Sequence, residues 1–129
     1  MRLAHEAKRV AAQHDAIDAF ERDVRAALHG GDAAAIETSL RAFEKALLAH
    51  FSLEEELHFP ALHGLGAALR PQLEALERDH VAFRAEIARL VACRDERRPA
   101  RIDAFAALAT ALRQHEDREE ALFGRTTPT

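Results

Sequence analysis

The spacing of apolar residues is the feature that most constrains the fold of this chain. Over 36–57, 73–90 and 102–122, the positions typical of a helical core recur at steps of three and four residues. This period places their side chains on one face of an α-helix, where packed helices make contact. A half-buried strand would instead alternate at every second residue, so the three segments are predicted to be long amphipathic helices.

Glycine and proline residues divide the chain into four helical segments. The first helix is expected from about residue 3 to residue 29, with an apolar stripe that starts at Leu3 and Val10. Asp32 is the expected N-cap of the second helix, and Pro71 takes a favourable first-turn position in the third. The expected breaks are Gly30-Gly31, the stretch from Pro60 to Pro71, and the stretch from Arg94 to Pro99.

Short connections make successive helices antiparallel neighbours. The predicted fold is therefore all-α, an up-down-up-down antiparallel four-helix bundle. At 129 residues the chain fits one domain over 1–129, in which 124–129 is expected to be a flexible tail. The single cysteine, Cys93, excludes an intramolecular disulfide and is predicted to be a small core residue.

Composition and charge argue against several classes of partner. The 18 basic and 22 acidic residues are interspersed, so no basic stripe is available for nucleic acid. No apolar run reaches the length of a membrane span, and charges interrupt the opening MRLAHEAKRV, so neither a membrane anchor nor a secretory signal is expected. The expected location is the cytoplasm.

Four histidines and two glutamates occupy or adjoin core positions, where an unpaired polar group is costly. Any one of them could be a hydrogen-bonded core residue. Their order repeats, however, because each half of the chain holds a lone histidine followed by a histidine and a glutamate four residues apart. The first half has His14, His50 and Glu54, and the second half has His80, His115 and Glu119.

The spacing also predicts that these six side chains meet. His14 and His50 lie 16 and 19 residues from the Gly30-Gly31 turn. At about 1.5 Å per residue, their heights in the bundle agree to within roughly one turn. His80 and His115 are about equally far from the connection near residue 97. All six side chains can therefore lie in one interior layer.

Six imidazole and carboxylate donors exceed the needs of one four-coordinate zinc, and the absence of thiolates argues against a structural zinc site. Two metal ions use the donors better. The two glutamates would bridge the ions, with the histidines of the first half on one ion and those of the second half on the other. Mixed nitrogen and oxygen ligation with open positions favours iron and suits manganese less well. Zinc could still occupy the site after heterologous expression.

The order of these motifs resembles the hemerythrin-like proteins, which carry a histidine-histidine-glutamate cation-binding domain, over nearly the whole chain. The resemblance implies two non-heme iron ions in a carboxylate-bridged, oxo- or hydroxo-bridged centre that binds or reacts with dioxygen, peroxide or nitric oxide. It rests on the lone His14, HFSLEEELHFP with His50 and Glu54, ERDH with His80, and HEDREEALF with His115 and Glu119.

One residue departs from the pattern of the family's oxygen carriers. Leu76 stands four residues before His80, where the carriers place a fifth histidine. The chain is therefore expected to react onward with dioxygen or peroxide rather than to carry oxygen reversibly. Glu77 is a candidate additional metal ligand and otherwise a surface residue. Ferritin-like bundles use paired E-x-x-H motifs, and only Glu77 to His80 forms one on a stripe here.

Several functions remain open at this point. They are a gas-binding or sensing protein, an oxidoreductase that consumes peroxide or nitric oxide, an iron storage or iron-donor protein, and a metal-free helical interaction domain. A sensor without an output domain would need a partner or an oligomer such as a homodimer. Phe51, Phe59, Phe83 and Phe123 could shield the site or only pack the core.

The remaining histidines and several glutamates are given structural roles. The histidines are expected off the stripes or in a connection, and the glutamates on solvated faces, with hydrogen bonding to the metal ligands as the minor alternative. They are His5, His29, His58, His63, Glu55, Glu56, Glu116 and Glu120.

Overall fold

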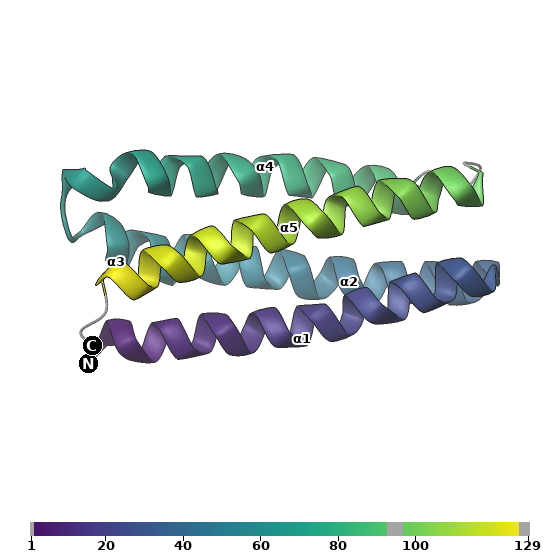
Figure 1. Cartoon of the computed structure of the whole chain (residues 1–129), viewed down its shortest axis with the longest axis horizontal. Helices are drawn as coiled ribbons and strands as arrows, with labels where there is room; N and C mark the ends of the chain where they lie inside the picture. Colours follow the sequence, from purple (N-terminus) through teal and green to yellow (C-terminus); the bar gives the residue numbers. More distant parts are fainter. Residues whose placement is uncertain (1, 93–96, 127–129) are drawn as a thin grey trace.

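The structure, a computed structural model, describes residues 2–92 and 97–126, and it describes side chains over 12–92 and 97–122. Four long helices lie side by side and alternate in direction, and the described residues contain no strand, which confirms the all-α bundle (Figure 1). Helix α1 packs on α2 and α5, and α4 packs on the same two helices. The elements are α1 (Arg2–Gly30), α2 (Ala33–Leu53), the π-helix η1 (Glu54–His58), α3 (Phe59–His63), the 3-10 helix η2 (Ala67–Leu69), α4 (Arg70–Ala92) and α5 (Arg98–Thr126).

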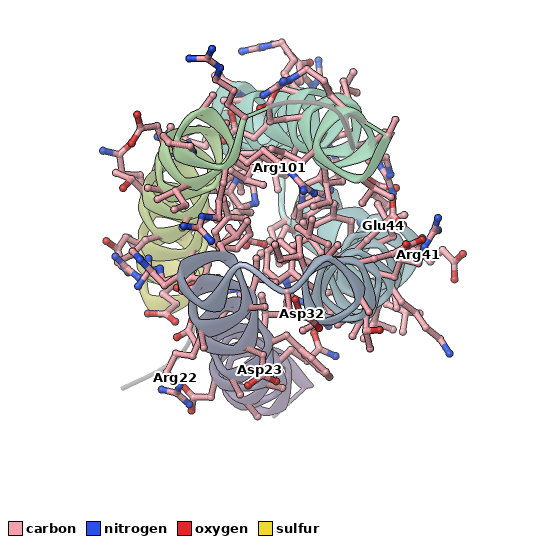
Figure 2. All side chains as sticks on the ribbon, turned by 90° about the vertical axis from the view of Figure 1, so that its right-hand side faces the viewer. Arg22, Asp23, Asp32, Arg41, Glu44 and Arg101 are labelled. Carbon is pink, nitrogen blue, oxygen red and sulfur yellow. The ribbon has the colours of Figure 1, made fainter. Side chains whose placement is uncertain are left out.

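The turn between α1 and α2 follows the predicted chemistry. Gly31 adopts a φ of 79°, a left-handed conformation that glycine tolerates best. Asp32 is the predicted N-cap, since its side chain accepts a hydrogen bond of 2.9 Å from the backbone N–H of Ala35. Figure 2 views the bundle from this end, where charged side chains such as Arg22 and Arg41 point outward.

The end of the second helix differs from the prediction. The chain stays helical through Pro60 to His63, and the five residues from Glu54 form a π-helix. A π-turn adds one residue per turn and so rotates the residues that follow it. Leu57, predicted on the apolar stripe, is therefore 42% exposed, while His58, predicted off the stripe, is fully buried.

Two apolar clusters fill the interior, and the polar core residues lie between them along the chain. Along α4 the order is Leu76 of one cluster, then His80, then Phe83 of the other. The same order, reversed, runs along α5. The larger cluster is toward the Gly31 turn, and the smaller one comprises Phe59, Leu62, Leu73, Leu76 and Leu122.

Some predictions fall on residues about which the structure says nothing. Cys93 and the side chains of Leu3, Val10 and Phe123 lie outside the described residues. Helix α5 continues past Gly124 to Thr126, further than predicted, and 127–129 are not described. None of the helices in the described ranges combines the length and apolar character that a membrane crossing requires.

Candidate metal centre

The structure brings the six predicted polar residues together in the layer between the two apolar clusters. They form two groups, and within each group the donor atoms lie within 4.8 Å of one another. All six side chains are at most 5% exposed. One group holds His14, His50, Glu54 and Glu119, and the other holds His80, His115, Glu54 and Glu119.

Both glutamates belong to both groups. The Oε1 atom of Glu54 lies 3.2 Å from Nε2 of His50 and 3.2 Å from Nε2 of His80. The Oε1 atom of Glu119 lies 3.3 Å from Nε2 of His14 and 3.2 Å from Nε2 of His115. Each carboxylate therefore stands between one histidine of each half of the chain, which is the position a bridging carboxylate requires.

The atoms that face the centre of this layer have no hydrogen-bond partner within the described part of the chain. They are the Nε2 atoms of all four histidines and both carboxylate oxygens of the two glutamates. Buried polar atoms are nearly always satisfied, so such a concentration needs an explanation. Metal cations would bind these nitrogen and oxygen atoms, and the residues present therefore fit a pair of metal ions.

The protonation states also suit a metal. Burial would raise the pKa of Glu54, but the close imidazoles of His50 and His80 outweigh it and lower the pKa to about 2. Burial lowers the pKa of His115 to about 4, against the pull of Asp79. Near neutral pH Glu54 is thus an anion and His115 is neutral, and these are the forms that bind metals.

The outward-facing nitrogen of each histidine has a partner on a neighbouring helix. The Nδ1 atom of His50 lies 2.7 Å from Oε1 of Gln13, and that of His115 lies 2.8 Å from Oδ2 of Asp79. Such contacts fix the tautomer and orientation of a ligating imidazole. The other two contacts join His80 to Glu55 at 2.8 Å and His14 to Glu120 at 3.2 Å.

Two of these partners are themselves held by arginines. Arg84 donates from both terminal nitrogens to Glu55, at 2.6 and 2.9 Å, and lowers the pKa of that carboxyl below its usual value. Arg118 donates to Asp79. Burial would raise the pKa of Asp79, but the bonds to His115 and Arg118 lower it.

Adjacent glutamates serve two purposes at the start of the π-helix, as Glu119 and Glu120 do on α5. Glu54 begins η1 and points into the layer, while Glu55 reaches the outer nitrogen of His80. π-helical turns are rare and occur frequently at functional sites. Pro60, which has no N–H to donate, follows this wide turn and tolerates the locally altered hydrogen bonding.

Aromatic rings cover the histidines of the second half. Phe51 stacks on His80 with ring centroids 4.0 Å apart and an interplanar angle of 20°. Phe59 lies 5.2 Å from His80, and Phe83 lies edge-on 5.4 Å from His115. These three phenylalanines therefore pack the core and border the site.

Glu77 is not brought to this site. Its side chain is 46% exposed and its Oε1 atom lies 3.0 Å from Nε2 of His63. Glu56 is exposed as predicted, whereas Glu55 and Glu120 contact the candidate ligands. Gln13 and Asp79 were missed, although each immediately precedes a histidine at the same place in the repeat.

Glu116 adjoins the site on α5 and is half-buried. Burial raises its pKa to about 7, opposed by His14 and supported by the carboxylates of Asp18, Glu21 and Glu120. Part of the Glu116 population therefore carries a proton at neutral pH, unlike Glu54.

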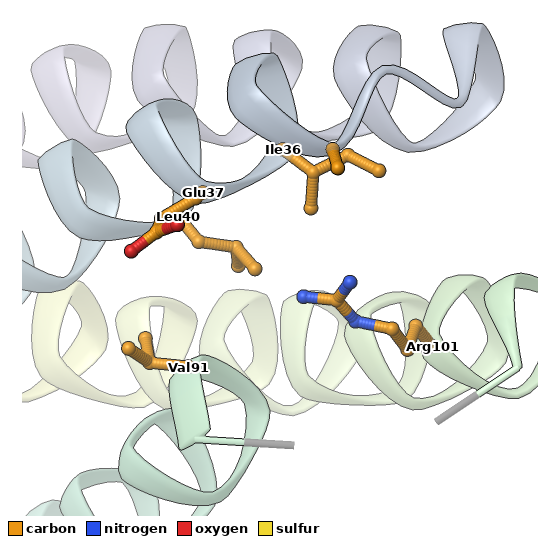
Figure 3. Close-up of a pocket in the computed structure, with 6 residues that line it drawn as sticks. Ile36, Glu37, Leu40, Val91 and Arg101 are labelled. Carbon is orange, nitrogen blue, oxygen red and sulfur yellow. The ribbon is translucent and has the colours of Figure 1, made fainter. Parts of the chain in front are cut away.

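A separate cavity of about 90 Å³ lies between the turn end of α2 and the start of α5. Arg101 reaches into it from α5, facing Ile36 and Leu40 (Figure 3). The buried Nε of Arg101 has no hydrogen-bond partner among the described residues. Ile36 precedes His50 by four turns of α2, roughly 20 Å along the axis, so this cavity is distinct from the candidate metal centre.

Comparison with known proteins agrees with this geometry. Residues 5–126 match the family model described as the hemerythrin HHE cation binding domain. Neither a curated protein nor a solved structure matches the chain. Because the match covers nearly the whole chain and the buried histidine and glutamate groups are suited to a metal site, the chain belongs to the hemerythrin HHE cation-binding domain family.

Proposed function

We propose that this protein is a non-heme di-iron protein that binds or reacts with dioxygen, peroxide or nitric oxide. The observation that carries the proposal is the pair of overlapping buried groups, each with two imidazoles and two shared carboxylates. Two irons, one in each group, would be bridged by Glu54 and Glu119 and held by the four histidines. Mixed imidazole and carboxylate donors that leave places open favour iron among the common metals.

Bound irons would supply electrons and open coordination places for the small ligand. The protein's own part is to hold the donors in the metal-binding state and to keep them dry. Glu54 stays ionised and His115 stays neutral because of their surroundings. The two apolar clusters on either side of the layer keep bulk water from the donors, which strengthens electrostatic interactions within it.

Leu76 supports onward reaction rather than reversible oxygen carriage. Its side chain is 2% exposed and packs in the smaller apolar cluster with Leu73 and Leu122. It offers no donor one turn before His80, and Glu77 is directed to His63 at the surface. With neither residue available, a metal held by His80 and His115 would keep a place open for a small ligand.

Anaerobic reconstitution with ferrous iron tests the proposal. We expect saturation at two irons per chain, measured by metal analysis, and an optical change when air is added that does not reverse on purging with inert gas. Binding at the wild-type level by a His50→Ala, His115→Ala double variant would exclude the site. Complete return to the colourless ferrous form over repeated cycles would instead establish an oxygen carrier.

A further inference from the structure

The internal repeat extends beyond the six candidate ligands to their outer hydrogen bonds. In each half, the residue before the lone histidine contacts the second histidine, as Gln13 contacts His50 and Asp79 contacts His115. The residue after each glutamate contacts the lone histidine of the opposite half. These contacts are Glu55 with His80 and Glu120 with His14.

The two halves differ, however, in the charged groups that take part in these outer hydrogen bonds. Gln13, a neutral amide, stands where the second half has the carboxylate Asp79. Position 18, which matches Arg84, holds an aspartate, and position 53, which matches Arg118, holds a leucine. The histidines of the second half thus contact two carboxylates held by arginines. Those of the first half contact an amide and the carboxylate of Glu120, which is 51% exposed.

We propose that the two metal positions are inequivalent, and that Gln13 sets the difference. The position of His80 and His115, here the second-half position, takes the first metal ion and holds it tightly. The position of His14 and His50, the first-half position, takes the second ion more weakly and exchanges it. This inference rests on the proposed two-metal site.

Hydrogen-bond chemistry gives the direction of the difference. When Nε2 binds a metal, Nδ1 carries the proton and donates it outward. Donation to a carboxylate increases the basicity of the ligating nitrogen, and a hydrogen bond to a charged acceptor is roughly twice as strong as one to a neutral acceptor. Arg84 and Arg118 withdraw part of this charge, but they fix the carboxylates in place before a metal arrives.

The packing around the two positions also favours tighter metal binding at the second-half position. Phe51 and Phe59 lie against His80, and Phe83 lies against His115. Arg84 also lies over the Phe51 ring, at 5.7 Å from its centroid, and ties that ring to Glu55. Three phenylalanine rings therefore pack against the histidines of the second-half position, and Phe51 lies farther from His50 of the first-half position, at 6.2 Å.

The first-half position borders an open space. A cavity of about 230 Å³ between α1 and α2 has Gln13 and His50 in its wall, together with Leu53. A cavity of about 190 Å³ on the α4 and α5 side is lined by Leu76 and Leu122 and includes none of the six candidate ligands. Of these two cavities, the one beside Gln13 therefore borders a candidate ligand, and that ligand, His50, belongs to the first-half position.

Stepwise titration with Co²⁺ alone tests the assignment. The two dissociation constants are measured by calorimetry on the metal-free full chain, with cobalt absorption as a second readout. Gln13→Glu should tighten the second step by about 10- to 100-fold and leave the first unchanged, whereas Asp79→Asn should weaken the first step by a similar factor. Gln114→Glu is the matched control, because it adds the same charge on the exposed face beside His115.

The outcomes separate this inference from the proposed function. If wild-type protein binds no cobalt and no iron, the two-metal site itself is wrong. If two ions bind and Gln13→Glu tightens the first step, the order of filling is reversed from ours. If two ions bind and Gln13→Glu acts no differently from Gln114→Glu, the outer hydrogen bond does not set the difference. The Gln13→Glu, Asp79→Asn double variant should exchange the two positions.

Discussion

Replacing one carboxylate should remove most of the stability that metal gives to this bundle. Glu54 is fully buried, belongs to both candidate groups and lies between His50 and His80. Glu54→Gln keeps the shape of the side chain but takes an anionic donor from both positions. Glu56→Gln is the matched control, because Glu56 lies two residues further on and is exposed.

The size of the effect follows from linkage. An ion that binds only the native state, at a free concentration 100 times its dissociation constant, adds about 2.7 kcal/mol, so two ions add about 5 kcal/mol. For a chain of this length each kcal/mol moves the melting temperature by roughly 3–5 °C, which gives a shift of about 15–25 °C. Glu54→Gln should retain only a small part of this shift, and Glu56→Gln should retain all of it.

Thermal unfolding followed by far-ultraviolet circular dichroism measures the effect. Each protein is melted anaerobically with ferrous iron and again with a chelator, and iron content is determined on the same samples. Equal melting temperatures for iron-loaded and iron-free wild type, with two irons confirmed, would refute a site buried in the core. A Glu54→Gln shift as large as that of wild type would refute the bridging role of Glu54.

Three further predictions concern other residues of the bundle. In the metal-free protein, Glu116→Gln should raise the free energy of unfolding above pH 7 by about 1 kcal/mol, after allowance for solvent exposure. Because burial raises the pKa of Glu116 in the folded state, its ionised carboxylate destabilises the fold, and the glutamine removes this effect. The difference should vanish below about pH 4.5 in urea titrations, and a difference independent of pH would exclude this cause. Arg101→Met should stabilise the fold by about 1 kcal/mol in the same assay, since it removes a buried Nε without a partner; destabilisation would mean that the guanidinium is satisfied by another group. Leu76→His should lower the free energy of unfolding of the metal-free protein by about 2 kcal/mol, because it puts a polar group into an apolar cluster. In the iron-loaded protein, more of the iron should return to the ferrous state when oxygen is purged. Unchanged reversibility would show that Leu76 does not determine whether oxygen is released.

The sequence was enough to predict the bundle and to identify the six candidate ligands among the polar residues buried in its core. The helical period of the apolar residues survives in the structure, because each of the four long helices buries apolar side chains at this spacing over the residues whose side chains are described. The six residues were recognisable because the same order of histidine and glutamate occurs twice. A single histidine at a core position, such as His80 alone, would have carried no such information.

The change of face after Glu54 could not be read from periodicity. A stripe counted in steps of three and four assumes a constant turn, and a π-helix inserts one residue without leaving a gap in the apolar pattern. For this reason Leu57 is exposed and His58 is buried, the reverse of the prediction. The nearest local signal was Pro60, which indicates an altered hydrogen-bond pattern but also fits the end of a helix.

The outer contacts depend on which helices become neighbours. Gln13 and Asp79 each precede a candidate ligand, so their side chains point about 100° away from it around the helix. Only the packing of α1 on α2, and of α4 on α5, turns these positions toward His50 and His115. Glu55 and Glu120 were predicted to lie mainly in solvent, because each is also about 100° around the helix from its neighbouring candidate ligand. Both do keep substantial exposure, and they contact His80 and His14 all the same.

The location of the polar layer links metal binding to the stability of the whole bundle. Each long helix supplies at least one of the six donors, and apolar side chains pack on both sides of the layer. Without a metal, the layer places unsatisfied donors and acceptors at the point where all four helices converge, which costs free energy. With two metals bound, the same atoms join α1 and α2 to α4 and α5. If the first-half ion is the exchangeable one, its loss would free His14 on α1 and His50 on α2, while Glu54, which directly follows α2, would stay held together with α4 and α5.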